Sequence, residues 1–322
     1  MNEVALEARG LTKLYGGGYR LIGRPRLANH AVSDVSFSLR RGQTLGIVGE
    51  SGCGKSTLAR MLAGLVSPSA GTVSVNGKVF AGEGITPPRD ARRTIQYVFQ
   101  DPVGSLNPRK TIRKILQAPL NRLGRHDRDR RDERLRELMD AVKLREEFFD
   151  RYPHELSGGQ AQRVGIARAL AADPEIVILD EPVSALDVSV QAQVLALFSE
   201  LQQRFRLAYV FISHNLAVTE AVSDRVAVMY FGRIVEQAPV QWFFAGPRHP
   251  YSKLLLDSAP AIGRRSKQVT VAIAELPDPF DPPPGCAFAA RCTNVGPRCR
   301  RETPELTRMA EEHDASCFHP LQ

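Results

Sequence analysis

A glycine-rich segment near residue 50 has the composition of a phosphate-binding loop. It lies between an apolar run at 44–48 and a stretch with helical character at 56–65. Closely spaced glycines let successive backbone N–H groups converge on phosphate oxygens, and the following helix adds the positive end of its dipole. A plain glycine-rich turn with an exposed lysine is the alternative, which the strand–loop–helix context disfavours. The segment consists of Gly49, Glu50, Ser51, Gly52, Cys53, Gly54, Lys55, Ser56 and Thr57.

Within this segment Lys55 can place its charge on the β- and γ-phosphates, and the Ser56 hydroxyl can bind Mg²⁺. Two consecutive carboxylates, Asp180 and Glu181, end a second apolar run at 176–179. Asp180 is suited to hold Mg²⁺ through water, and Glu181 to polarise an attacking water as a general base. The apolar runs at 176–179, 208–212 and 226–230 are continuous, as is typical of a parallel sheet covered on both faces.

A second candidate for anion binding precedes a helical stretch at 162–170. It consists of Ser157, Gly158, Gly159 and Gln160. By itself, Ser157 could be only a helix cap and the glycines only a turn. However, the exposed N–H groups of a second helix N-terminus are another anion site, which gives one chain two phosphate-binding devices.

Length and composition indicate a globular protein with one large α/β domain and a small appendage. The chain has 322 residues, 43% of them hydrophobic and 24% charged. No apolar run is long enough to span a membrane and the N-terminus lacks the features of a secretion signal, so we expect a cytoplasmic chain whose cysteines are thiols or metal ligands. The expected domains are 1–260, with a helical subdomain at about 101–160, and a proline-led extension at 261–322.

The net charge of +8 does not by itself identify a partner. Much of the arginine lies at 122–136, interleaved with Asp and Glu, which favours a solvated helix face with ion pairs. Charge alone therefore decides nothing about the partner.

The order of these motifs along nearly the whole chain resembles that of the nucleotide-binding subunit of an ABC transporter. The segment at 49–57 resembles the Walker A loop, that at 156–160 the signature, and Asp180 with Glu181 the Walker B pair. Four further positions match the Q-loop (Gln100), the D-loop (Asp187, in 184–187), the switch histidine (His214) and the adenine-stacking aromatic (Tyr15). For Tyr15 a plain packing role is the alternative.

The resemblance implies a P-loop ABC ATPase core with a mostly parallel sheet, an N-terminal antiparallel β part, a helical subdomain and a small cysteine-containing tail. It implies two subunits closed head to tail, so that ATP on one P-loop meets Ser157 and Gly159 of the other. Gln100 would sense Mg²⁺ and the attacking water. His214, which alone would more often be a core histidine, would contact the γ-phosphate. Residues 101–155 would grip a coupling helix of the permease.

Three stretches, at 105–109, 151–155 and 249–251, are similar to the oligopeptide/dipeptide importer subfamily. Residues 159–160 and 166–170 resemble its F-type ATPase, although Ala161 departs from the basic residue expected there. The implied partners are a second ATPase subunit, most simply in a heterodimer, two permeases and a solute-binding protein, with this chain peripheral on the cytoplasmic side of the inner membrane. Alternatives are another solute of the subfamily, such as glutathione or nickel, or a nucleic-acid- or ribosome-associated ABC ATPase. Proteins of that last kind usually carry two such domains in one chain, a long coiled coil or a zinc insertion. The sequence has none of these, so we expect no nucleic-acid partner.

Four cysteines lie in the tail with spacing C-x5-C-x6-C-x17-C, at Cys286, Cys292, Cys299 and Cys317. This is not the paired C-x-x-C of a zinc ribbon, although four thiolates in a reducing compartment suit a [4Fe–4S] cluster. Members of the importer subfamily that the chain resembles carry such a cluster in this tail. Zinc and no metal remain alternatives.

Overall fold

An eight-stranded sheet runs through the computed structural model, which describes residues 3–16, 28–123, 130–258 and 277–322. Its order is β11-β12-β10-β9-β3-β8-β7-β6, and the five strands from β9 to β6 are parallel. The apolar runs predicted as parallel strands are therefore confirmed. The strands are β3 (Thr44–Val48), β6 (Ile95–Val98), β7 (Ile176–Asp180), β8 (Ala208–Ser213), β9 (Arg225–Tyr230), β10 (Arg233–Pro239), β11 (Thr307–Ala310) and β12 (His313–Ala315).

A second, antiparallel sheet forms most of the N-terminal part, in the order β2-β1-β4-β5. Its strands are β1 (Val4–Gly16), β2 (Ala28–Arg40), β4 (Ala70–Val75) and β5 (Lys78–Gly82). The prediction of short strands over 4–48 is wrong for β1 and β2, which have 13 residues each. Their pairing shifts register at several points, and such bulges let a long strand twist and bend while it stays paired.

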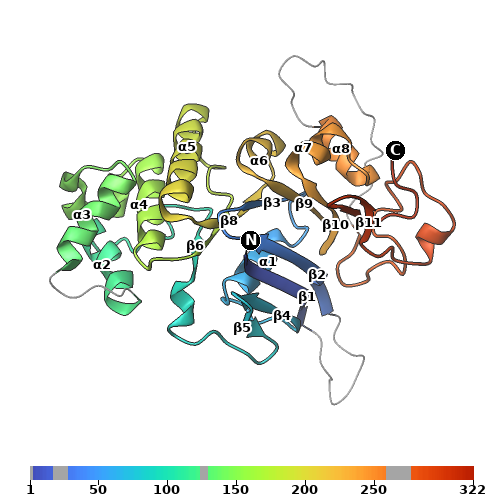
Figure 1. The fold of residues 1–322 in the computed structure, drawn as a ribbon, viewed down its shortest axis with the longest axis horizontal. Coiled ribbons are helices and arrows are strands. Elements are labelled where there is room, and N and C mark those ends of the chain that lie inside the picture. Colours follow the sequence, from blue (N-terminus) through green and yellow to red (C-terminus); the bar gives the residue numbers. More distant parts are fainter. Residues whose placement is uncertain (1–2, 17–27, 124–129, 259–276) are drawn as a thin grey trace.

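Helix α1 (Lys55–Leu62) packs in the core between the two sheets (Figure 1). Leu58 and Leu62 of α1 are fully buried in a cluster that also contains Leu6 of β1 and Ile47 of β3. The apolar face of this short helix therefore fixes the loop that precedes it against both sheets.

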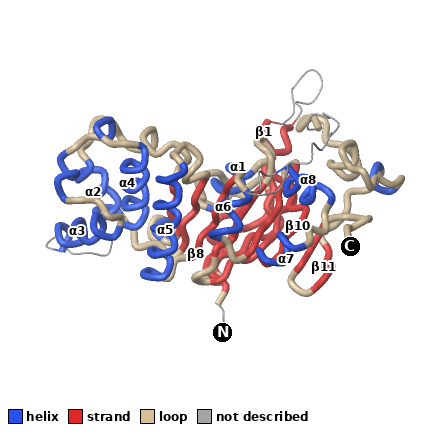
Figure 2. The backbone as a smooth tube through the Cα atoms, turned by 90° about the horizontal axis from the view of Figure 1, so that it is seen from above, coloured by secondary structure: helices blue, strands red, loops and turns tan. Residues whose placement is uncertain are grey.

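Helices cover the opposite face of the parallel strands and continue into an arm at one end of the molecule (Figures 1 and 2). Alternate side chains of β7 divide between the two cores: Ile178 joins the α1 side, and Val177 and Leu179 join the helical side. The elements of the helical side are α2 (Ile112–Arg122), α3 (Arg131–Ala141), the 3-10 turns η3 (Glu146–Asp150) and η4 (Pro153–Glu155), α4 (Gly158–Leu170) and α5 (Val188–Phe205).

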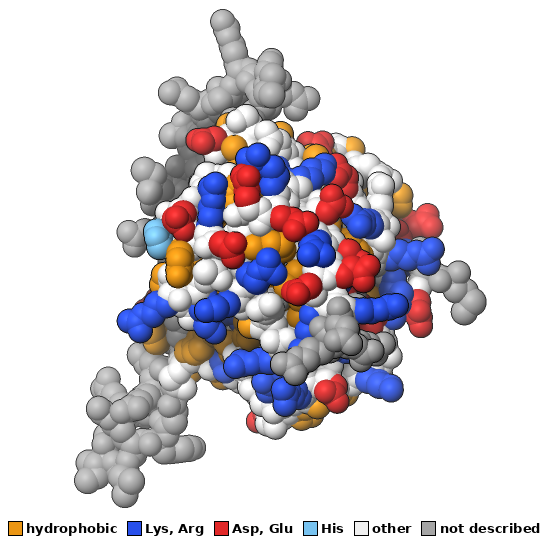
Figure 3. All heavy atoms as spheres, turned by 90° about the vertical axis from the view of Figure 1, so that its left-hand side faces the viewer, with side chains coloured by type: hydrophobic (Ala, Val, Ile, Leu, Met, Phe, Trp, Pro, Cys, Tyr) orange, Lys and Arg blue, Asp and Glu red, His pale blue; other side chains and the backbone are white. Residues whose placement is uncertain are grey.

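Basic and acidic side chains intermingle over the outer end of this arm (Figure 3). Arg134 pairs with Glu137 and Asp173, and Arg136 with Glu146. The predicted ion-paired helix face is therefore present in the described part of 122–136, whereas 124–129 lie outside the described residues.

A third core joins the C-terminal extension to β9 and β10. Phe288 of the extension packs with Tyr230, Phe243 and Tyr251. The other elements of the chain are α6 (Leu216–Val222), α7 (Val240–Ala245), α8 (Pro250–Ser258), and the 3-10 turns η1 (Ala91–Arg93) and η5 (Arg298–Arg300).

A buried hydrogen-bond network reinforces this junction. The fully buried carboxylate of Glu236 in β10 accepts bonds from the backbone N–H groups of Arg248 and His249, and lies 2.7 Å from Nε2 of His313 in β12. The predicted domain boundary at 260 lies outside the described residues. Within the parts of the chain that the structure describes, every helix is too short or too polar to cross a lipid bilayer.

Candidate active site

The loop between β3 and α1 wraps around the ammonium group of Lys55. Lys55 is buried, and its Nζ donates to the carbonyl oxygens of Gly49 at 2.7 Å and Glu50 at 2.8 Å. At Gly54, φ is 103° and a Cβ would overlap the carbonyl oxygen of Ala31, so only glycine fits there. The loop thus presents a fixed concave backbone and one cation, as a phosphate-binding loop requires.

Cys53 is an internal part of this loop. Its side chain is 2% exposed, and burial is the main cause of a raised thiol pKa. The thiol is therefore neutral near pH 7, and the side chain packs in the core instead of serving as a nucleophile.

Ser56 and Asp180 meet beside the loop, although 124 positions separate them. The Ser56 hydroxyl donates to Oδ1 of Asp180 at 3.2 Å, and the Tyr97 hydroxyl donates to Oδ2 of the same carboxylate at 2.5 Å. Asp180 is 4% exposed, at the end of β7. A hydroxyl and a carboxylate at this separation are oxygen ligands of the kind Mg²⁺ prefers, directly or through water.

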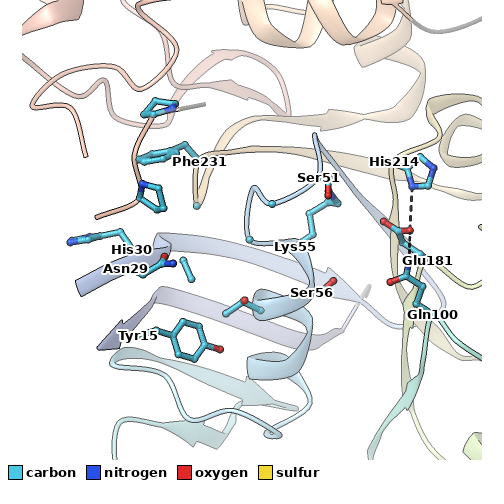
Figure 4. A pocket seen from close by; sticks show the side chains of 17 residues that line it. Tyr15, Asn29, His30, Ser51, Lys55, Ser56, Gln100, Glu181, His214 and Phe231 are labelled. Atoms are coloured by element: carbon cyan, nitrogen blue, oxygen red, sulfur yellow. Dashed lines mark hydrogen bonds and ion pairs between the residues drawn. The ribbon is translucent and has the colours of Figure 1, made fainter. Parts of the chain in front are cut away.

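Three polar side chains converge opposite Lys55, at the carboxyl ends of adjacent strands (Figure 4). Gln100 follows β6, Glu181 follows β7 and His214 follows β8. Nε2 of Gln100 donates to Oε2 of Glu181 at 3.0 Å, and Nδ1 of His214 lies 3.3 Å from the same oxygen. Ligand sites of open α/β sheets lie at this edge. The predicted Gln100, Glu181 and His214 are thus brought into one cluster.

One cavity of about 700 Å³ joins the phosphate loop and this cluster. Such a volume can hold a nucleotide-sized ligand. Tyr15 lines its far end with a half-exposed ring, and its contact with adenine stays a prediction. Of the other predicted residues, Ser51, Gly52, Gly54, Lys55, Ser56, Thr57, Gln100, Glu181 and His214 line the same cavity.

Sequence reasoning missed seven lining residues. Asn29, His30 and Ala31 come from β2, and Phe231 and Gly232 from the turn after β9. Pro277 and Pro279 come from the extension, and Pro279 accepts a hydrogen bond of 3.1 Å from the N–H of His30. In the sequence the proline pair indicates only the proline-led extension, and nothing in its spacing indicates contact with residues near position 30.

The predicted signature does not line this cavity. Ser157 caps α4: its Oγ accepts from the N–H of Gln160 at 3.4 Å, and the Gln160 side chain accepts from the N–H of Ser157 at 2.9 Å. A Cβ at Gly159 would meet the Val190 side chain at 2.7 Å, so α4 begins close against α5, which Asp187 precedes. The second anion-binding device and Asp187 therefore lie apart from the loop of Lys55 in the same chain.

The four tail cysteines line one narrow cavity. All are free thiols, and burial is the first cause of raised pKa values at Cys286, Cys292 and Cys317, the last to about 11. Backbone N–H groups point at three sulfur atoms: that of Asn294 at Cys292 (3.3 Å), that of His319 at Cys317 (3.4 Å), and that of Gly296 at Cys299 (3.5 Å). Such bonds stabilise thiolate ligands. Nevertheless, in the described part of the chain no three His, Cys, Asp or Glu side chains are arranged to hold one metal ion.

Two family models match the chain in succession. The ABC transporter model matches residues 32–184, and the model of the oligopeptide/dipeptide transporter C-terminal region matches residues 235–299. The dimeric structure of the ATP-binding cassette MJ0796 in a post-hydrolysis state with ADP and Pi is similar in fold. It has a TM-score of 0.63 and 27% sequence identity, covering 73% of this chain and 98% of that one.

Curated relatives are similar over nearly the whole chain. The di/tripeptide transport ATP-binding protein DppF of Pseudomonas aeruginosa (strain UCBPP-PA14) is 46% identical over 99% of both chains. The oligopeptide transport ATP-binding protein AppF of Bacillus subtilis (strain 168) is 46% identical, with 98% of this chain and 97% of that one covered. The relatives match nearly the whole chain, and the two family models match its N-terminal and C-terminal parts. The chain therefore belongs to the ABC transporter family, as an ATP-binding subunit with the C-terminal region of the oligopeptide/dipeptide group.

Proposed function

We propose that this chain hydrolyses ATP to drive the import of di- or oligopeptides. One observation carries most of the argument: a single cavity places Lys55 of the phosphate loop opposite the cluster of Gln100, Glu181 and His214. The names of the curated relatives supply the solute class, since they describe di/tripeptide, dipeptide and oligopeptide transport ATP-binding proteins.

In this proposal the phosphate loop binds the nucleotide. Lys55 turns from the carbonyl groups of its own loop to the β- and γ-phosphates, which neutralises charge that develops in the transition state. Ser56 and Asp180 would hold Mg²⁺, which would supply positive charge beside the phosphates. The backbone N–H groups of 49–57 surround the phosphates, and Tyr15 stacks on the base.

Glu181 is the proposed general base. Its carboxylate is 17% exposed and faces the cavity, where it can orient a water for in-line attack on the γ-phosphorus. Gln100 and His214 both contact Glu181, so they can sense the same water and the γ-phosphate. Gln100 would also take part in holding Mg²⁺.

The partner is a second ATPase subunit, and we propose a heterodimer closed head to tail. Support comes from the separation of the two anion-binding devices within one chain. A partner would bring its signature, equivalent to Ser157, Gly158, Gly159 and Gln160, to the γ-phosphate bound here, with Asp187 at the interface. The related cassette MJ0796 is described as dimeric, which supports the pairing of two such subunits.

We further propose two permeases and a solute-binding protein as partners, with this chain bound to the cytoplasmic face of the inner membrane. Residues 1–260 would form the ATPase domain, its helical subdomain at about 101–160 would contact the permease, and 261–322 would form the extension.

For the extension we propose a [4Fe–4S] cluster held by Cys286, Cys292, Cys299 and Cys317. The convergence of four sulfur atoms on one cavity and the backbone N–H groups directed at them support it. The four cysteines would hold the cluster as thiolates, and the directed N–H groups would stabilise those thiolates.

Uptake into vesicles reconstituted with both ATPases, both permeases and the binding protein tests the function. We expect ATP-dependent uptake of a labelled dipeptide and stimulation of phosphate release by the loaded binding protein. Uptake of glutathione or Ni²⁺ in place of peptides would reassign the solute. ATP hydrolysis without uptake of any of the three would contradict the import proposal.

A further inference from the structure

The second residue of the phosphate loop is held by the C-terminal extension. Both terminal nitrogens of Arg291 donate to the two carboxylate oxygens of Glu50, each at 2.8 Å, across 241 positions of sequence. The side chains are only 12% and 30% exposed. An arginine–carboxylate pair that is bidentate and largely shielded from solvent contributes to the free energy of folding. Freely exposed pairs, such as others on this surface, contribute little.

The same residue of the loop is also held through its backbone. The N–H of Glu50 donates to the Tyr251 hydroxyl at 2.9 Å, and its carbonyl oxygen accepts from Lys55. Any movement of Glu50 therefore moves both an acceptor of the Lys55 ammonium and the loop N–H groups next to it. Those are the groups that must face phosphate oxygens.

Arg291 itself has little freedom. Its guanidinium lies 5.8 Å from the ring centroid of Phe288 and 5.9 Å from that of Tyr230. The backbone N–H of Arg291 donates to the backbone carbonyl of Phe288 at 3.0 Å. This bond belongs to a run of tight turns that leads from Cys286 to Cys292. The arginine is thus fixed by the wall of the cysteine cavity on one side and holds the phosphate loop on the other.

The extension reaches the nucleotide cavity at a second place. Pro277 and Pro279 line it, and the Pro279 carbonyl is bonded to His30 in β2. The phosphate loop and the part of the cavity wall around His30 therefore both contact residues beyond 276.

We propose that the C-terminal extension is part of the nucleotide site of its own chain, with Arg291 as a positioning residue that holds the phosphate loop through Glu50. The turns from Cys286 to Cys292 that carry Arg291 also form a wall of the cysteine cavity, so a change in that wall should act on nucleotide binding. This goes beyond the proposed transport function and requires only that the chain binds nucleotide.

The test is titration of the full-length isolated chain with a fluorescent ATP analogue in the presence of Mg²⁺. We expect Arg291→Ala to weaken binding by roughly tenfold or more, since it leaves the Glu50 carboxylate unpaired. Arg291→Lys should retain part of the affinity, because a lysine offers a point charge without the two-pronged fork. The matched control is Arg308→Ala in the same extension. Its exposed guanidinium pairs with Asp314 at 2.6 Å, and neither residue lines the nucleotide cavity or the cysteine cavity, so affinity should stay within about twofold.

Glu50→Gln provides an independent test if Arg291→Ala does not fold, because it keeps the side-chain shape and removes the charge. It should weaken binding in the same direction, and the double substitution should weaken it less than the sum of the two. A folded Arg291→Ala chain that unfolds at lower temperature yet binds as tightly as the unsubstituted chain would overturn the proposal. So would an unchanged affinity in Glu50→Gln. Because the titration is independent of the transported solute, failure here would leave the import proposal standing.

Cys292→Ser tests the connection to the cysteine cavity. We expect Cys292→Ser alone to weaken nucleotide binding several-fold. In a chain that already carries Arg291→Ala it should cause little further loss of affinity, because both substitutions would act through the position of Arg291. Fully additive losses would show that the two residues act separately and would overturn the link.

Discussion

The side-chain amide of Gln100 donates a hydrogen bond of 3.0 Å to Glu181, although the two residues lie 81 positions apart. Adjacent parallel strands β6 and β7 end at the same sheet edge, and the residues after them meet there. Glu181 also adopts φ 47°, a left-handed conformation that is uncommon for a residue other than glycine. A strained backbone that turns a carboxylate into a cavity is typical of a functional position.

Replacing Glu181 by Gln should leave Mg-ATP binding intact and reduce hydrolysis by roughly 10²- to 10⁴-fold, the range for loss of a general base. Gln keeps the size and the contact with Gln100 but cannot accept a proton. The measurement is steady-state phosphate release by the assembled transporter. Glu175→Gln, at the start of the same strand and paired with Arg41 at 2.6 Å, serves as control and should stay near normal. Near-normal turnover of Glu181→Gln would exclude it as the base.

Ser157→Arg should abolish the activity contributed by the partner's phosphate loop and leave nucleotide affinity of the free subunit almost unchanged. The reason is that Ser157 caps α4 and lies away from the cavity of its own chain. Binding titrations of the free subunit beside turnover of the complex measure the two effects. Ser199→Arg, on the exposed side of α5, should change neither. If affinity of the free subunit fell as steeply as turnover, the cross-chain assignment would be wrong.

Tyr97→Phe should raise the Mg²⁺ concentration needed for half-maximal hydrolysis by several-fold. The Tyr97 hydroxyl holds one oxygen of Asp180, and its loss removes a bond to a charged group, worth about 1.5–3 kcal/mol. Tyr209→Phe is the matched control, since its buried hydroxyl donates to the Phe198 carbonyl at 3.1 Å instead. Both variants should be less stable to urea, and only Tyr97→Phe should shift the Mg²⁺ titration. An identical titration for the two would show that Tyr97 only packs.

Anaerobically purified protein should be brown, absorb broadly near 400 nm as thiolate-ligated clusters do, and contain about four irons per chain. Cys292→Ser should bleach it and make the extension sensitive to protease, while the ATP-binding domain stays folded. The Cys53→Ser variant should keep the iron, because Cys53 is buried in the phosphate loop and does not line the cysteine cavity of the extension. Iron-free, colourless protein with a protease-resistant extension would contradict the cluster, and stoichiometric zinc would favour a structural zinc site.

Local chemistry was readable from the sequence. The glycines around Lys55, the Ser157 cap and the carboxylates after the 176–179 run each depend on neighbours within a few positions, because hydrogen bonding and backbone conformation act at short range. Continuous apolar runs likewise predicted the central parallel strands, since both faces of such a strand must be covered.

The tertiary structure decided which of these local pieces share a site. The meeting of Ser56 with Asp180 depends on the order of strands in the sheet, which no spacing along the chain encodes. The contacts of Pro279 with His30 and of Arg291 with Glu50 depend on the third core, where Phe288 packs on Tyr230 and Tyr251. In the sequence Arg291 is one arginine of many beside a cysteine. Folding places it against a particular carboxylate because apolar burial some residues away holds the extension on the ATP-binding part.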